Sequence, residues 1–259
     1  MAAIEPAAKP GIAGGVYVYG LTWSGGGSKG RGIADADVMT LEHGELAAIV
    51  STVGGRAMRA KRRDLLRHSD VLQDAFAKAP VLPFRFGTVL ASEEAVVDDL
   101  LAARYEELVA LLRRFEGLGE LRLRATFVEE PVLAEIVQGE PRIAALREAT
   151  KGTRAGSVAD PRRIELGEAV ARALAARRGG AADEIVASLA EHALELQVEE
   201  QREELEVLRA SFLVDRRRLP KFEGAAKALA GRYGGRISFD LIGPMPPHSF
   251  VSLTPRQGA

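Results

Sequence analysis

The end of the chain constrains the fold most, because it predicts two strands joined by a helix. Residues 207–214 are largely apolar, which is typical of a buried strand. Residues 220–233 predict a helix. Further on, Ile237, Phe239 and Leu241 alternate with other residues and fall on one face of a second strand. A strand, a helix and a strand in succession must bury a shared face, so this part of the chain has to form a sheet covered by a helix.

An earlier segment predicts a further strand of the same sheet. Over 121–127, apolar residues alternate with charged or polar ones, as in a strand with one face in water. Together with the helices that follow it, this strand predicts a ferredoxin-like α+β domain enlarged by a helical insertion around 131–200. The expected helices span 141–149, 162–178 and 183–200, with loops at 152–161 and at Gly179–Gly180 between them.

The first half of the chain predicts a separate α+β domain. Residues 16–21 predict a strand, and 38–41 with 46–53 predict a hairpin whose polar turn contains Gly44. The glycine-rich stretch 24–32 lies between them and predicts a mobile loop.

Two helices are expected after the hairpin. Within 63–78, Leu65, Leu72 and Phe76 fall on one side of the first helix. Ser92 is the expected N-cap of the second. The apolar stripe of that second helix consists of Val97, Leu101, Tyr105, Leu108, Leu112 and Phe115.

These elements divide the chain into two domains. The glycines at 117 and 119 stop the second helix, so the boundary is expected there. We therefore expect a flexible leader at 1–15, an N-terminal α+β domain at 16–117 and a C-terminal ferredoxin-like α+β domain at 118–254.

Composition indicates a globular protein with a substantial core and excludes several classes of function. Of the 259 residues, 47% are apolar and 27% are charged. The net charge of −1 gives no general attraction to nucleic acid or to anionic membranes. Because cysteine is absent, disulfides, thiolate metal sites and a cysteine nucleophile are excluded. No stretch approaches the roughly 18 apolar residues of a spanning helix, so we expect a soluble cytoplasmic protein and no membrane partner.

No pattern in the chain predicts a catalytic, cofactor or metal site. The four histidines lack metal-binding spacing, and His68 is expected to be a packing residue on its helix. Residues 25–30 lack the Gly-Lys-Ser/Thr order of a phosphate loop. Glu129 and Glu130 would point to opposite faces of a strand, which prevents paired acid and base chemistry. The basic run in 56–63 has no aromatic side chains around it to stack bases, so RNA binding is a minority alternative. We expect no enzyme, no cofactor and no nucleic acid.

An unusual apolar run contains one arginine. Leu82, Phe84 and Phe86 would share one face of a strand, with Pro83 and Arg85 on the other. Since proline donates no hydrogen bond, this strand begins at Pro83 or lies at an edge of its sheet. Arg85 is expected to be partly buried between the phenylalanines, where it would need hydrogen-bond acceptors and would act as a structural anchor rather than as a ligand-binding group.

Several stretches together resemble the gas vesicle protein F/L family. The family carries a Leu-Pro-x-Arg-Phe-Gly-Thr tract and a Gly-Pro-x-Pro-Pro-x-Ser-Phe-Val tail, which match this chain at 82–88 and at 243–251. The segments 16–20 and 212–215 also match, whereas Met245 and His248 replace the usual aromatic residues of the tail. The interaction residues implied by the resemblance are Leu82, Pro83, Phe84, Arg85, Phe86, Gly87, Phe212, Gly243, Pro244, Pro246, Pro247 and Phe250.

The resemblance implies an accessory or minor structural protein of gas vesicles, which are cytoplasmic gas-filled compartments with a protein shell. It implies a role in shell assembly, with the major shell protein and other gas vesicle accessory proteins as partners and no small-molecule substrate. A shell subunit with an apolar gas-facing side is prone to aggregate, so a chaperone-like partner could cover it. The alternative from another class is a small-molecule-binding regulator or an enzyme on a ferredoxin-like scaffold. The shared tracts do not separate F-type from L-type members.

Overall fold

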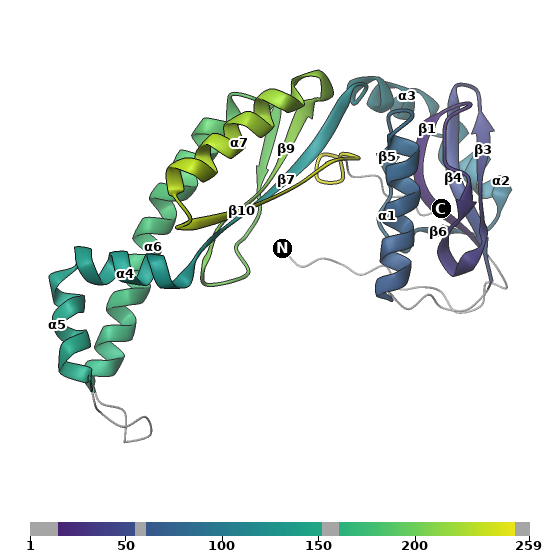
Figure 1. The fold of residues 1–259 in the computed structure, drawn as a ribbon. Helices are drawn as coiled ribbons and strands as arrows, with labels where there is room; N and C mark the ends of the chain where they lie inside the picture. Colours follow the sequence, from purple (N-terminus) through teal and green to yellow (C-terminus); the bar gives the residue numbers. More distant parts are fainter. Residues whose placement is uncertain (1–14, 55–60, 152–160, 252–259) are drawn as a thin grey trace. The chain divides into compact units, whose positions relative to one another are not determined.

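The computed structural model describes residues 15–54, 61–151 and 161–251. The leader expected at 1–15 lies almost entirely outside them, as do Arg56 and Arg59 of the basic run. Figure 1 shows the chain as helices and strands in nearly every described segment.

The described residues form two compact units. The second is Leu121–Gly243, and the first contains the residues up to Glu120 together with those from Pro244 on. The chain therefore passes from one unit to the other twice. The domain bounds expected from the sequence stay a prediction, and the contacts group the tail with the N-terminal part of the chain rather than with the segment before it.

The first unit is built on a six-stranded sheet. Its strands are β1 (Gly15–Trp23), β2 (Gly30–Arg31), β3 (Asp37–His43), β4 (Leu46–Val53), β5 (Leu82–Pro83) and β6 (Val89–Leu90). They lie in the order β2-β3-β4-β1-β5, with β6 also paired to β1. The pairings of β1 with β4, β5 and β6, and of β3 with β2 and β4, are antiparallel. The predicted strand and hairpin are thus confirmed.

Strand β1 pairs with β4 on one side and with β5 and β6 on the other, and it is buried along nearly its whole length. Helix α1 (Arg62–Phe76) contacts it, and Val71, Leu72 and Phe76 are buried in the same core cluster as Tyr17. Leu65 was expected on the buried side, but it is 45% exposed, because it lies in the first turn of the helix and the buried stripe begins one turn later.

The second helix expected in this unit is not continuous. The Ser92 side chain accepts a hydrogen bond from Ala95 N over 3.2 Å, as expected of an N-cap. The segment then divides into α2 (Glu93–Ala95), the π-helix η2 (Val96–Ala102) and α3 (Tyr105–Arg114). A π-helix inserts an extra residue into a turn and so shifts the apolar stripe around the helix axis. A short 3-10 turn, η1 (Ile33–Asp35), precedes β3.

The second unit has a four-stranded sheet. Its strands are β7 (Leu118–Phe127), β8 (Glu195–Val198), β9 (Glu206–Asp215) and β10 (Ile237–Met245), in the order β10-β7-β9-β8. Its helices are α4 (Glu129–Gly139), α5 (Pro141–Thr150), α6 (Pro161–Ala190), the turn η3 (Arg216–Arg218) and α7 (Leu219–Tyr233).

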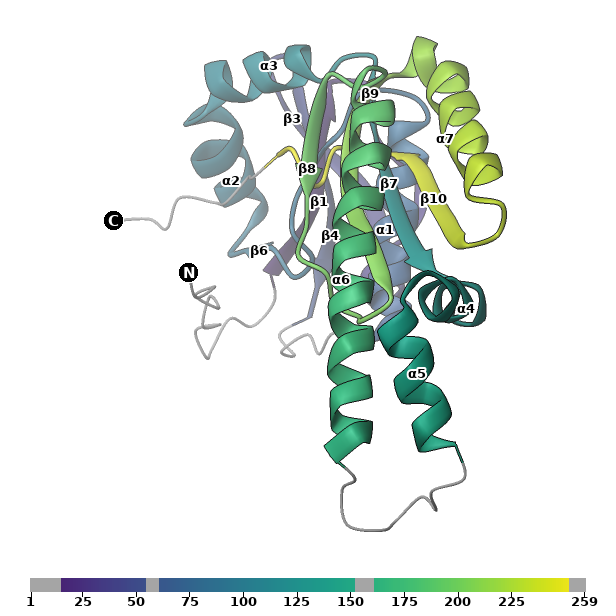
Figure 2. The ribbon, with the colours of Figure 1, turned by 90° about the vertical axis from the view of Figure 1, so that its left-hand side faces the viewer.

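These elements follow one another as strand, helices, strand, strand, helix, strand, which is the ferredoxin-like succession. Figure 2 shows α6 and α7 side by side on one face of the sheet, where they contact each other and share a core with β7 and β9. Helices α4 and α5 are the insertion, and both contact α6. The expected α+β class, with a modified ferredoxin-like part, is confirmed.

Three expectations for the insertion are wrong. Gly179–Gly180 does not end a helix, because α6 continues through it with Leu174 and Ile185 buried on either side. Residues 195–198 form strand β8 instead of helix, since Leu196 packs against the core. Helix α4 was not expected at all: Glu129 and Glu130 lie in its first turn, where carboxylates favour the positive end of a helix, and are not a strand end.

The glycine-rich stretch 24–32 is tied to the sheet. The Glu42 carboxylate accepts hydrogen bonds from Ser24 Oγ over 2.8 Å and from Gly25 N over 3.0 Å. Ser28 Oγ donates to Asp74 of α1 over 2.7 Å. These contacts join the stretch, which the sequence predicts as a mobile loop, to β3 and α1.

Candidate functional site

The tract at 82–88 lies at the edge of the first sheet. Leu82 and Pro83 form β5, the last strand in the order, so the expected edge position of Pro83 is confirmed. The expected alternation is wrong, because Leu82, Pro83 and Phe84 are all buried and the strand is only two residues long. Residues 84–88, which we call the Arg85 loop, follow it.

Backbone hydrogen bonds to β1 fix both ends of the Arg85 loop. Phe84 N donates to Tyr19 O over 2.8 Å, and Val18 N donates to Thr88 O over 3.0 Å. Between them, Gly87 has a φ of +90°, a backbone conformation that side chains other than glycine rarely adopt. The glycine of the tract is therefore required by the turn.

His68 of α1 supports the loop from inside the unit. Its Nδ1 lies 2.8 Å from the Tyr17 hydroxyl, and Gly87 N donates to the same hydroxyl over 3.1 Å. His68 also hydrogen bonds to the backbone of Phe84, and its ring meets the Phe86 ring edge-on with centroids 5.7 Å apart. The loop is thus joined to α1, the helix that precedes it in the chain.

Electrostatics keep this buried network neutral. Burial and, to a smaller extent, the nearby His248 lower the pKa of His68 to about 4, although the hydrogen bond to Phe84 partly opposes both. Burial raises the pKa of the Tyr17 hydroxyl above its ordinary value. Neutral His68 donates a hydrogen bond to the Phe84 backbone, which leaves Nδ1 to accept a hydrogen bond from the Tyr17 hydroxyl. The expectation that His68 is a packing residue is confirmed.

Arg85 is exposed at the tip of this fixed loop. Its guanidinium makes no hydrogen bond or ion pair with any other residue that the structure describes, so the expected burial and anchoring role are wrong. Phe86 next to it is half-buried. The loop therefore presents a cation beside partly accessible aromatic surface, held in position from below.

The tail is bound to the same unit. Ser249 donates from both N and Oγ to the buried Glu120 carboxylate, over 2.7 and 2.8 Å. Gln73 Nε2 of α1 donates to Pro244 O over 3.0 Å. Of the other tail residues, Pro246 and Pro247 are buried, Phe250 is half-buried, and Gly243 is exposed with a φ of +132°.

Phe212 has a structural position in the second unit. It is fully buried in β9, and its ring meets that of Phe222 edge-on at a centroid distance of 5.0 Å. A side chain so enclosed contacts no partner, so the interaction role implied for Phe212 has no support from its position.

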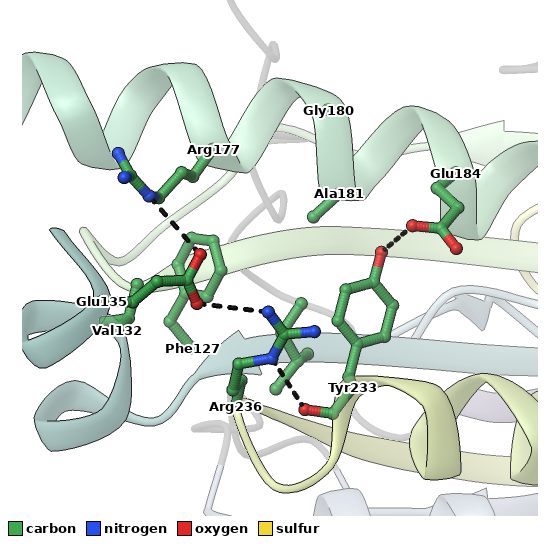
Figure 3. Close-up of a pocket in the computed structure, with 10 residues that line it drawn as sticks. Phe127, Val132, Glu135, Arg177, Gly180, Ala181, Glu184, Tyr233 and Arg236 are labelled. Carbon is green, nitrogen blue, oxygen red and sulfur yellow. Dashed lines mark hydrogen bonds and ion pairs between the residues drawn. The ribbon is translucent and has the colours of Figure 1, made fainter. Parts of the chain in front are cut away.

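The second unit contains a pocket of about 290 Å³ that the sequence does not predict (Figure 3). Figure 3 shows Glu135 at one end, where it accepts a hydrogen bond from Arg236 over 3.2 Å and pairs with Arg177 at 3.7 Å. At the other end the Tyr233 hydroxyl donates to Glu184 over 2.7 Å. Burial and this contact raise the pKa of Tyr233 to about 12. The acidic groups of the wall are thus already paired, and they come from helices too far apart in sequence to form a motif.

Other kinds of site were sought in the same residues. Over 15–54, 61–151 and 161–251, no three His, Asp or Glu side chains converge in a way that could hold a metal ion. None of the helices described there combines the length and the apolar character needed to cross a membrane.

Comparison with known proteins gives a consistent match over nearly the whole chain. The family model described as "Gas vesicle synthesis protein GvpL/GvpF" matches residues 15–252. A gas vesicle protein F from Streptomyces is 34% identical over 244 residues, which cover 91% of this chain and 98% of the relative. One from Dolichospermum flosaquae is 21% identical over 196 residues, covering 75% and 79%.

Two crystal structures share the fold. GvpF from Anabaena has a TM-score of 0.76 at 20% identity and covers 93% of this chain and 99% of its own. GvpF from Microcystis aeruginosa has a TM-score of 0.72 at 20% identity, covering 92% and 99%.

Proposed function

Because the chain belongs to the GvpL/GvpF family of gas vesicle synthesis proteins, we propose that it is an accessory protein that binds the apolar major shell subunit and limits its aggregation during assembly. The family is one of gas vesicle structural and accessory proteins, which gives the chain a gas vesicle-related role. We place this role in the cytoplasm, at the growing vesicle, together with other gas vesicle accessory proteins.

The observation that carries the proposal is the Arg85 loop. It lies in a tract that resembles the family motif, its conformation is fixed by hydrogen bonds, and its arginine is left available. Arginine beside aromatic surface is a common centre of protein interfaces, because it combines charge with a planar apolar face. A subunit with an apolar side needs a soluble partner before assembly, and such a loop could hold its polar margin.

The test is light scattering of purified shell subunit diluted from denaturant. The wild-type protein at equal molarity should suppress scattering and co-elute with the subunit. Arg85→Glu should require about tenfold more protein for the same suppression, which corresponds to about 1.4 kcal/mol of binding free energy. The matched control is Arg62→Glu, a charge reversal of another exposed arginine of the first unit.

The outcomes test separately whether the protein binds the shell subunit and whether the Arg85 loop is the binding site. If the wild-type protein leaves scattering unchanged and forms no complex, binding of the shell subunit is disproved. If Arg85→Glu acts as well as wild type, the shell subunit binds elsewhere and the Arg85 loop is not its site.

A further inference from the structure

Strand β8 is an open edge of the second sheet. It is the last strand in the order β10-β7-β9-β8, and its pairing with β9 runs from Glu195 opposite Leu213 to Val198 opposite Ala210. Figure 2 shows β8 beside β9, with α6 passing in front of the sheet. No described strand pairs with its other side.

The register shows which backbone groups face outward. Glu199 N donates to Arg209 O over 2.9 Å, so the 199/209 pair is a hydrogen-bonded pair of the antiparallel ladder. Such pairs alternate along a strand, so Gln197 also directs its backbone groups toward β9. Leu196 and Val198 therefore direct their N–H and C=O groups away from β9, toward the open side.

Apolar side chains accompany these free backbone groups. Leu196 and Val198 share one face of the strand, and Leu196 packs against the core of the unit. Val198 is 59% exposed, and Leu194, just before the strand, is 58% exposed. The core thus continues onto the open edge as an uncovered apolar strip. Lysine and proline commonly protect edge strands, and 194–198 contains neither. The ladder is irregular only at the start of β8, where Leu194 N donates to Leu213 O, the residue opposite Glu195.

The charge around the edge indicates what would bind there. Residues 191–206 contain seven glutamates and one arginine. Arg124 and Arg209 neutralise Glu206, Arg124 also pairs with Glu203, and Arg202 pairs with Glu199, but no described side chain pairs with Glu200. Glutamates outnumber arginines within this segment, so its charge favours a cationic partner.

We propose that β8 binds an extended segment of another protein in which apolar residues alternate with lysine or arginine, and that this segment adds a fifth strand to the sheet. Main-chain hydrogen bonds from Leu196 and Val198 would give affinity, and the exposed apolar strip and the glutamates would give specificity. This site is distinct from the Arg85 loop and does not depend on the partner being the shell subunit.

The probe is a fluorescein-labelled seven-residue peptide that alternates lysine and valine, titrated by fluorescence anisotropy into the full-length protein. A peptide with glutamate in place of lysine is the control for charge. We expect the lysine peptide to bind at least tenfold more tightly than the glutamate peptide. In hydrogen exchange, the amides of Leu196 and Val198 should become protected when the lysine peptide binds.

Three variants at one position separate strand addition from simple charge attraction. Val198→Pro removes an N–H that faces away from β9, so it should weaken binding at least tenfold while the ladder to β9 remains. Val198→Lys keeps the N–H but repels the peptide, and it loses no buried contact because Val198 is exposed. Val198→Thr keeps both N–H and shape and should bind within twofold of wild type. Circular dichroism checks that each variant is folded.

Each outcome decides the proposal. Failure of the wild-type protein to bind the lysine peptide would overturn it, as would equal binding by folded Val198→Pro, which would indicate charge attraction alone. If Val198→Pro does not fold, Val198→Lys and the exchange of the two amides decide instead. None of these measurements uses the shell subunit. The β8 proposal can therefore be overturned while the proposed function holds, and the proposed function can be overturned while the β8 proposal holds.

Discussion

At the scale of single residues, the buried His68 gives the clearest pH dependence. Its pKa is about 4 in the folded protein and about 6.5 when unfolded, so the unfolded state binds the extra proton between these values. The stability it contributes is fully present above about pH 6.5 and is lost as the pH falls through about 4. Lowering the pH from about 7 to about 4.5 should therefore remove on the order of 2 kcal/mol from the free energy of unfolding through this residue.

Urea unfolding of wild type and His68→Phe at both pH values measures this contribution. The variant loses the hydrogen bonds to Tyr17 and Phe84, so it should be less stable near neutral pH by about 1–3 kcal/mol. Its decline on acidification should be smaller than that of wild type by about 2 kcal/mol, since the titrating group is gone. Equal declines for the two proteins would show that His68 is not held neutral by the fold.

His68 and Arg85 show which features of single residues can be predicted from the sequence. His68 could be recognised as a packing residue because helical spacing places it beside Leu72 on one face. The exposure of Arg85 could not be predicted, because the burial of its neighbours Phe84 and Phe86 depends on a loop that turns after Pro83. Neighbouring residues share a strand face only where the strand persists, and β5 ends after two residues.

At the scale of elements, replacing a glycine of the pair inside α6 should stabilise the protein, whereas most substitutions destabilise it. A Cβ added at Gly179 meets no atom within 4 Å, and glycine inside a helix costs about 0.5–1 kcal/mol relative to alanine. Gly179→Ala should therefore raise the free energy of unfolding by about that amount. Gly234→Ala is the control and should lower it by about 1 kcal/mol, because Gly234 ends α7 with a φ of +54°.

Urea titration followed by circular dichroism distinguishes the two variants. A loss of stability in Gly179→Ala would mean that α6 is broken at the glycines in solution, as the sequence pattern predicts. The pattern misses this helix because local propensity is weaker than packing: Leu174 and Ile185 are held in the core on both sides of the pair.

Strand β8 and helix α4 were missed for related reasons. The glutamates around 195–198 are good helix formers, so only the contact of Leu196 with a distant core selects a strand. In α4, Pro131 obscures the start of a helix, although proline is tolerated in a first turn because the N–H groups there have no partner within the helix. The long alternating strands β7 and β10, whose pattern repeats several times, were predicted well.

At the scale of the whole molecule, the sequence predicts the first strand of the second unit and its β-α-β end, but it does not show where the tail returns. The β-α-β pattern at the end of the chain is local, so it could be read from the sequence alone. The grouping of residues after 244 with the first unit depends on contacts such as Ser249 with Glu120, which are far apart in the sequence. Long-range pairs of this kind leave no periodic signal.

The tail should therefore stabilise the first unit. If the chain ends after Met245, β10 is kept whole, but the buried Glu120 carboxylate loses both hydrogen bonds from Ser249. Loss of hydrogen bonds to a buried acceptor is destabilising by about 1–3 kcal/mol. Hydrogen exchange measured by mass spectrometry should show faster exchange in α1 and β5 of the truncated protein, with α6 and α7 unchanged. A chain ending after Val251 keeps the Ser249 contacts and is the control, for which no change in these elements is expected. Faster exchange confined to Leu121–Gly243 would instead assign the tail to the second unit, as the domain bounds expected from the sequence require.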